Sequence, residues 1–164
     1  MNDVIEKRLL PFIFKTSDQP MLFGELLQAN KTYQEGMSLE GTIPGFRMIL
    51  GRAYLVYLLF WHLIIAIPIG LFHHELRAID CHMLILVAVL FTGLFFSLFS
   101  LFSEWLHEKM ALLVIKKAWK NHFPHFAYEQ HATEVATIYN EALEHEIHHK
   151  DMRLYILDKL VKSD

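Results

Sequence analysis

The sequence contains little cysteine, proline or glycine, and these shortages exclude several classes of protein. A single cysteine, Cys81, excludes a disulfide-stabilised scaffold and a zinc or iron–sulfur site built from several cysteines. Five prolines and seven glycines in 164 residues exclude a collagenous or low-complexity chain. A formal net charge of −3 gives no overall attraction to nucleic acid. The sequence also lacks a glycine-rich phosphate loop, a Gly-x-Ser-x-Gly turn and a Cys–His nucleophile pair, so these common motifs of nucleotide binding and hydrolysis are missing.

Hydrophobic residues, in contrast, make up 54% of the chain, and many of them fall in two uninterrupted runs. The run 53–72 contains one ionisable side chain, His62, and the run 83–102 contains none. Each run is twenty residues long, which at about 1.5 Å per residue crosses a hydrocarbon core about 30 Å thick. The sequence therefore predicts an all-α fold with two transmembrane helices.

Lysine and arginine are distributed unevenly around these two spans, which predicts their orientation. Residues 1–52 contain six of them, residues 73–82 contain one, and residues 103–164 contain eight. By the positive-inside rule, both termini lie in the cytoplasm. The predicted organisation in the inner membrane is a cytoplasmic or interfacial helical segment (1–50), a first transmembrane helix (51–72), an extracytoplasmic loop (73–82), a second transmembrane helix (83–103) and a cytoplasmic helical region (104–164).

The short loop predicts that the two spans pack as an antiparallel hairpin. Reflecting the chain about the loop places His62 opposite Gly93, near the middle of the bilayer. Two pairs of small residues, Gly93 with Ser97 and Ala66 with Gly70, would let the helix backbones approach closely. We interpret His62 as a packing residue that bonds a neighbouring hydroxyl or carbonyl group; a role as proton relay or ligand is the alternative.

The segments outside the spans are also predicted to be helical. Apolar residues at near-helical spacing in the first fourteen positions favour an interfacial location or docking on a partner. Ser17 as N-cap and Pro20 in the first turn predict a helix that ends near Gln28, with a loop after it. The second span is predicted to continue as one rod from Met83 to about Asn121, because no helix breaker interrupts it.

A last helix is predicted from Ala127 to Val161. With a turn of about 100° per residue, one set of apolar residues forms a narrow stripe, and further apolar residues, among them Ile138, Met152 and Ile156, lie on the opposite face. A helix that is apolar on two sides is expected to pack between other elements or in an oligomer. The stripe consists of Ala136, Leu143, Ile147, Leu154 and Val161.

The run 144–149, Glu-His-Glu-Ile-His-His, is the main candidate for chemistry. His145-Glu146-x-x-His149 resembles the HExxH site of zinc metalloproteases, in which two histidines one helical turn apart bind zinc and the glutamate is the general base. His145-x-x-His148-His149 resembles one histidine box of the membrane fatty-acid desaturases and hydroxylases, which implies iron. Glu141, in register with His145, would be a further ligand. Each resemblance covers five residues, and charged residues directly follow the second histidine, unlike the usual zinc motif.

A third arrangement would join this region to carboxylates elsewhere in the chain. Four-helix di-iron proteins use two Glu-x-x-His pairs and two further glutamates, all pointing into the bundle. The sequence offers two such pairs, at 104–107 and 146–149. The further carboxylates would come from Glu25, Glu134 and Glu141.

Metal-binding residue types also crowd the predicted loop between the spans. His73, His74, Cys81 and His82 combine imidazole and thiol groups, which suit a transition metal, especially if a second protomer contributes ligands. The alternative interpretation is that polar residues simply end two helices at the membrane interface. Cys81 would also permit a disulfide across a homodimer on the oxidising side.

Together these patterns predict a small accessory or scaffold subunit that acts through helix–helix contacts in a larger membrane complex. Its expected partners are the lipid bilayer, other membrane-protein subunits or a second copy of the chain, and not nucleic acid. No cofactor is expected for this function. The alternative is a metal-dependent membrane enzyme, either zinc peptidase-like or di-iron oxidoreductase-like, in which His145, His148, His149 and Glu141 hold zinc or iron and Glu146 is catalytic.

Overall fold

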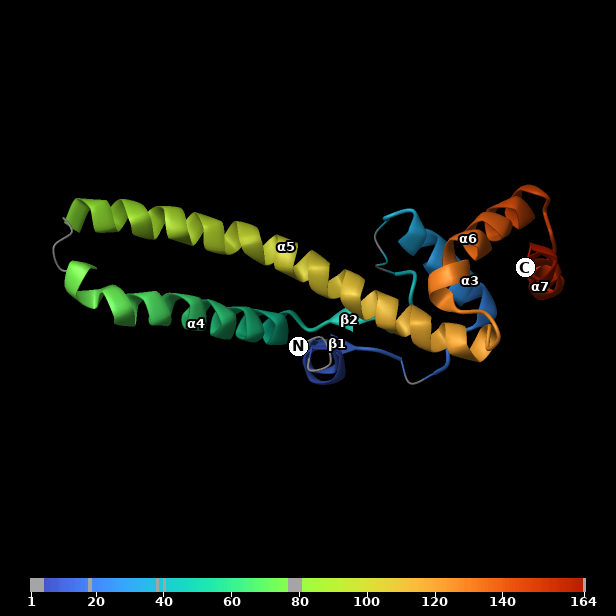
Figure 1. The fold of residues 1–164 in the computed structure, drawn as a ribbon, viewed down its shortest axis with the longest axis horizontal. Coiled ribbons are helices and arrows are strands. Elements are labelled where there is room, and N and C mark those ends of the chain that lie inside the picture. Colours follow the sequence, from blue (N-terminus) through green and yellow to red (C-terminus); the bar gives the residue numbers. More distant parts are fainter. Residues whose placement is uncertain (1–4, 18, 38, 40, 77–80, 164) are drawn as a thin grey trace.

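The computed structural model describes residues 5–17, 19–37, 39, 41–76 and 81–163, most of which are helical. Two long helices, α4 (Leu50–Leu76) and α5 (Cys81–His122), run antiparallel and form a hairpin at one end of the molecule (Figure 1). At the other end, α3 (Phe23–Gln34) packs on the last turns of α5, α6 (Tyr128–Glu144) packs on α3, and α7 (Met152–Ser163) packs on α6. We call this second part, together with residues 111–122 of α5, the head. The predicted all-α class is confirmed.

Both hairpin helices are long and apolar enough to span a membrane, and most of their side chains in that region are exposed. The helices extend beyond the predicted spans, since α4 continues to Leu76 and α5 begins at Cys81. The predicted rod is confirmed, because α5 is one continuous helix of 42 residues. At about 1.5 Å per residue this helix is roughly 60 Å long, so it reaches from the hairpin turn into the head.

Aromatic side chains, and not small residues, form the contact between α4 and α5. The hydroxyl of Tyr57 donates to the carbonyl oxygen of Phe95 at 2.7 Å, and the Tyr54 and Phe99 rings stack with centroids 3.9 Å apart. The rings of Trp61 and Phe91 meet edge to face at 5.0 Å. Bulky rings at these positions keep the two backbones apart, which is why close packing through glycine is not used.

The predicted small-residue packing is therefore wrong where the structure describes it. An added Cβ at Gly93 or Gly70 would meet no atom within 4 Å, and the exposed Ser97 hydroxyl donates to the carbonyl of Gly93 in its own helix. His62 is also exposed, with Nδ1 3.1 Å from the carbonyl oxygen of Leu58 one turn earlier. The side chain of Ala66 lies outside the described part of the chain.

Residues 5–15 pack against the base of the hairpin. A π-helical turn, η1 (Ile5–Leu9), leads into α2 (Leu10–Ile13), and strand β1 (Phe14–Lys15) pairs antiparallel with β2 (Arg47–Met48). This segment therefore packs on its own chain, and its predicted interfacial location or docking on a partner stays a prediction. The residues buried together here form what we call the base cluster, which consists of Leu10, Ile13, Phe14, Ala53, Tyr57, Phe99, Leu106 and Met110.

Helix α3 begins and ends later than its sequence predicts. The Ser17 hydroxyl accepts a hydrogen bond from the backbone N–H of Gln19 at 3.1 Å, so it stabilises a turn and does not cap a helix. The carboxylate of Glu25 instead accepts a bond from the N–H of Leu22 at 2.8 Å and closes the first turn of the helix. The helix then continues to Gln34 because its buried face packs on α6.

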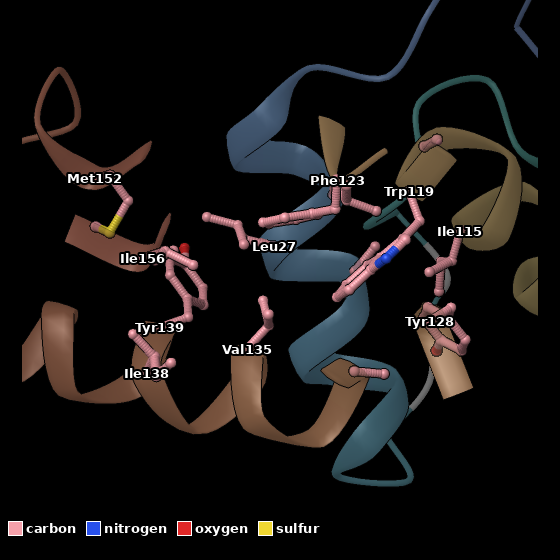
Figure 2. Packing of buried hydrophobic residues seen from close by; sticks show 14 of the residues in the cluster. Leu27, Ile115, Trp119, Phe123, Tyr128, Val135, Ile138, Tyr139, Met152 and Ile156 are labelled. Atoms are coloured by element: carbon pink, nitrogen blue, oxygen red, sulfur yellow. The ribbon is translucent and has the colours of Figure 1, made fainter. Parts of the chain in front are cut away.

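The head core consists of large side chains contributed by all four of its helices. Figure 2 shows Leu27 of α3 facing Val135 of α6, with Ile156 of α7 on one side of them. Trp119 of α5 and Phe123, the residue directly after α5, lie on the other side. The indole N–H of Trp119 donates to the carbonyl oxygen of Phe126 at 2.8 Å, which fixes the turn after α5. Asn30 is fully buried, and its amide donates to the carbonyl of Ala132 at 2.7 Å, joining α3 to α6.

The predicted single helix from Ala127 to Val161 is wrong, because α6 ends at Glu144. The N–H of Ile147 bonds the carbonyl of Ala142 at 2.9 Å and that of Glu146 bonds the carbonyl of Leu143 at 3.1 Å. These two bonds define a Schellman ending, in which the residue after the cap adopts a left-handed conformation. Glu146 does so, with φ of 53°.

Replacing Glu146 by glycine is expected to raise the stability of the head by about 1 kcal/mol, since glycine adopts positive φ without a Cβ clash. Hydrogen exchange of α6 and α7 in the purified protein measures this change. The same replacement at Glu144, where the backbone is helical, is the control and is expected to lower stability. Equal losses in both variants would contradict a left-handed turn at position 146.

The break resets the helical phase, so the predicted apolar stripe does not exist as one surface. In α7 the buried face consists of Met152, Ile156 and Leu160. Leu154 and Val161, which the prediction aligns with the buried Ala136, remain 72% and 67% exposed. These two residues are seven positions apart and therefore share one face of α7.

Candidate functional site: the head and the base of the hairpin

The histidine-rich run does not form the predicted metal-binding face. His145 is the residue that caps α6, and His148 and His149 lie in the turn before α7. All three side chains are exposed, and no helix carries them at the spacing that the zinc motif needs. Glu141, the proposed further ligand, forms an ion pair with Lys159 of α7.

The carboxylates of the di-iron hypothesis are similarly dispersed. Glu25 caps the start of α3, Glu134 lies 3.5 Å from the ring nitrogen of His131, and Glu104 lies on α5 at the base of the hairpin. Glu146 occupies the left-handed turn. Within the described ranges, no group of three or more His, Cys, Asp or Glu residues is placed to hold a metal ion.

The second metal hypothesis concerned the turn of the hairpin. His74 ends up in the last turn of α4 and His82 in the first turn of α5. The side chains of His73 and Cys81 lie outside the described part of the chain, and so do residues 77–80. That cluster stays a prediction.

A cleft of about 550 Å³ lies between the segment after β1 (residues 16–17 and 19–22) and the end of α5. Lys117 and Asn121 line it from α5, and Glu25 lines it from α3. The remaining walls come from Ile43 and Pro44 of the loop before β2 and from the segment after β1. The cleft is formed by three segments that are distant in sequence, so no local sequence motif predicts it. Its polar lining includes the ammonium of Lys117, the carboxylate of Glu25 and the amides of Gln19 and Asn121.

A smaller cavity of about 380 Å³ lies at the base of the hairpin, under Gly36, Met37 and Leu39. Its floor is a polar stripe on α5 that includes Ser103, Glu104 and His107. The His107 ring stands edge-on to Phe14 at 5.1 Å, and its Nδ1 lies 3.0 Å from the carbonyl oxygen of Ser103. These contacts make the imidazole part of the packing between β1 and α5.

The charged and titratable groups of the head join its helices to one another. A hydrogen bond of 2.7 Å from Lys116 lowers the pKa of Glu129, which ties α5 to α6. The hydrogen bond to Glu141 raises the pKa of Lys159 and ties α7 to α6. Burial raises the pKa of Tyr128 to about 12, so this phenol stays neutral at physiological pH and serves packing.

The most conspicuous surface feature of the head is apolar. Leu154 and Val161 project from α7, the helix farthest from the hairpin turn (Figure 1). Leu143 near the end of α6 is also exposed, at 43%. We call Leu154 and Val161 the α7 stripe. On its polar flank, Lys162 pairs with Asp158 at 2.5 Å.

Comparison of the chain with protein-family models, with curated proteins and with solved structures found no match.

Proposed function

We propose that the protein is a small membrane-anchored scaffold subunit, whose head holds a partner protein at the cytoplasmic face of the inner membrane. One observation carries the proposal: the α7 stripe exposes large apolar side chains at the end of the molecule away from the apolar hairpin (Figure 1). A bilayer that receives the hairpin cannot also cover this stripe. Exposed leucine and valine so placed favour contact with another protein.

Three features support the membrane placement. The hairpin helices are exposed and apolar over a span-like length. Lysine and arginine are concentrated in the parts of the chain outside the hairpin, as the positive-inside rule requires for a cytoplasmic head. In addition, α3 precedes the hairpin and α6 follows it, yet both belong to one core, so the two flanking parts lie on the same side.

The rod α5 supports a scaffolding role in particular. Its first part packs against α4, and its last turns contribute Ile115 and Trp119 to the head core. One uninterrupted helix therefore fixes the distance and direction of the head relative to the hairpin. Such rigidity suits a subunit that positions a partner. The metal-enzyme alternative is not carried further, because the helix that would bear its ligands ends at Glu144.

Site-specific photocrosslinking in the native membrane tests the proposal. A photoreactive residue in place of Leu154 is expected to give a discrete adduct with a membrane-associated protein or with a second copy of the chain. The same residue at Lys150, exposed in the turn before α7, is the comparison position. A chain that gives no protein adduct from Leu154 and purifies as a monodisperse monomer would refute the scaffold function.

Converting the α7 stripe to acidic residues provides the complementary prediction. Leu154→Asp with Val161→Asp is expected to remove the co-purifying partner and to change unfolding free energy by only about 0.5 kcal/mol per site, since both side chains are exposed. Leu22→Asp is the matched control, because Leu22, the residue before α3, is 67% exposed and lies outside the α7 stripe. Equal loss of the partner in the control would show that the α7 stripe is not the contact.

A further inference from the structure

The two-stranded ribbon at the base of the hairpin brings two cations face to face. In the antiparallel register Phe14 lies opposite Met48, and Lys15 lies opposite Arg47. Side chains alternate between the faces of a strand, so each pair occupies one face. Phe14 is buried in the base cluster, whereas Lys15 and Arg47 are both exposed on the opposite face.

Like charges in this position oppose the pairing of the strands. Directly opposed residues have Cβ atoms about 5 Å apart, and two equal charges at that distance destabilise a ribbon. Neither cation forms an ion pair with a carboxylate among the residues that the structure describes. The arrangement is therefore one that an anion between the two side chains would stabilise.

The position of Lys15 and Arg47 relative to the apolar part of α4 indicates which anion lies nearest to them. Arg47 precedes the span-like part of α4, which begins at Leu50, by three residues. A third cation lies beside the ribbon, since Arg52 donates from Nη1 to the carbonyl oxygen of Phe12 at 2.9 Å and covers its ring. In a membrane-inserted hairpin this level is that of the lipid phosphates.

We infer that Lys15 and Arg47 form a binding site for a phosphate anion, supplied by the headgroup of an anionic phospholipid. The planar guanidinium of Arg47 offers two parallel N–H donors to phosphate oxygens, and the ammonium of Lys15 adds a point charge from the opposite strand. The bound phosphate thereby joins β1 to β2. This inference rests on the membrane placement proposed above.

Hydrogen exchange in lipid nanodiscs tests the site. The N–H of Ile49 donates to the carbonyl oxygen of Ile13 at 2.8 Å, so its protection reports whether the ribbon is paired. In the unmodified protein we expect protection to rise about tenfold when phosphatidylcholine discs are replaced by equimolar phosphatidylcholine and phosphatidylglycerol. In Lys15→Glu, an opposite-charge pair replaces the like-charge pair. Protection is then expected to be higher in phosphatidylcholine alone and not to rise with phosphatidylglycerol.

Lys109→Glu separates a specific site from general attraction to anionic lipid. It makes the same change in net charge on an exposed turn of α5 whose neighbours, Leu106 and Met110, belong to the base cluster. It is expected to keep the full response. Equal loss of response in both variants, or no response in the unmodified protein, would overturn the inference.

Two further outcomes complete the test. If inorganic phosphate added to phosphatidylcholine discs raises protection as much as phosphatidylglycerol does, the anion site stands but the lipid source is overturned in favour of free phosphate. If the protein does not enter phosphatidylcholine discs at all, the proposed membrane placement fails, and this inference fails with it. Insertion without an anion response refutes the anion site alone.

Discussion

Trp119→Ala is expected to unfold the head while α4 and the first part of α5 remain helical. Trp119 is 2% exposed, and its ring packs against Phe123 at 4.5 Å and Tyr128 at 5.1 Å. Removing a buried tryptophan costs about 3–5 kcal/mol, and the substitution also leaves the carbonyl of Phe126 without its donor. Small domains have only about 5–15 kcal/mol of total stability, so this loss removes much of it.

Limited proteolysis and hydrogen exchange of residues 111–163 measure the effect. Trp105→Ala is the matched control, because Trp105 lies on the same helix but is 39% exposed. The control is expected to lose about 1 kcal/mol or less. Should the two variants be digested equally fast, the end of α5 would not be the centre of the head core.

The second large effect concerns the continuity of α5. Glu108→Pro is expected to bend or break the rod just before the head, between Leu106 and Met110 of the base cluster. The expected cost is about 3 kcal/mol or more, because proline removes the N–H donor to the carbonyl of Glu104 and its ring clashes there. Glu108 is exposed, so the effect arises from the backbone. Spin labels at Leu59 and Lys150, in a Cys81→Ser background, are expected to show a broadened distance distribution between hairpin and head.

Glu108→Ala keeps the helix and is expected to leave that distribution narrow. If the distance distribution of the proline variant is equally narrow, the contacts of residues 5–15 with the hairpin, and not the continuity of α5, hold the head in place. If the proline variant also loses the crosslink from Leu154 while the head stays folded, the rigid rod is needed to present the α7 stripe. That last result would connect the geometry of α5 directly to the scaffold function.

The hairpin and its rod could be predicted because their signal is local and strong. Runs of twenty apolar residues admit few other structures, and nothing between Met83 and Asn121 interrupts a helix. The all-α class followed from the same runs. The spacing of small residues did not predict which residues of the two helices are in contact. The large rings of Tyr57 and Trp61 make that contact, because they bury more apolar surface than glycine or alanine does.

The end of α6 was missed because its left-handed residue is glutamate. A glycine at position 146 would have predicted the end of the helix, whereas glutamate is compatible with a continuing helix in the sequence. The bonds that Ile147 and Glu146 donate back to Ala142 and Leu143 decide the outcome locally. This single turn removes the helix on which the zinc hypothesis depended.

The ribbon and the start of α3 failed to appear in the prediction for a different reason. Two residues in each strand are too few for a periodic pattern, and their pairing joins positions 15 and 47, which are far apart in the chain. Ser17 and Pro20 have the composition of a helix start, yet their hydrogen bonds form a turn before it. Contacts with the base cluster determine where the ribbon forms, and contacts with α6 determine where α3 lies.

The bond from Asn30 to the carbonyl of Ala132 has a consequence for how the protein is made. It joins residues 102 positions apart, with both hairpin helices between them. On the ribosome α3 emerges first, but Trp119 near the end of α5, Val135 and Ile156, which share a core with its buried leucines, are synthesised only after the apolar spans. A helix of twelve residues is marginal by itself in water. During translation α3 therefore stays without its core until the hairpin has been made, and the head folds last.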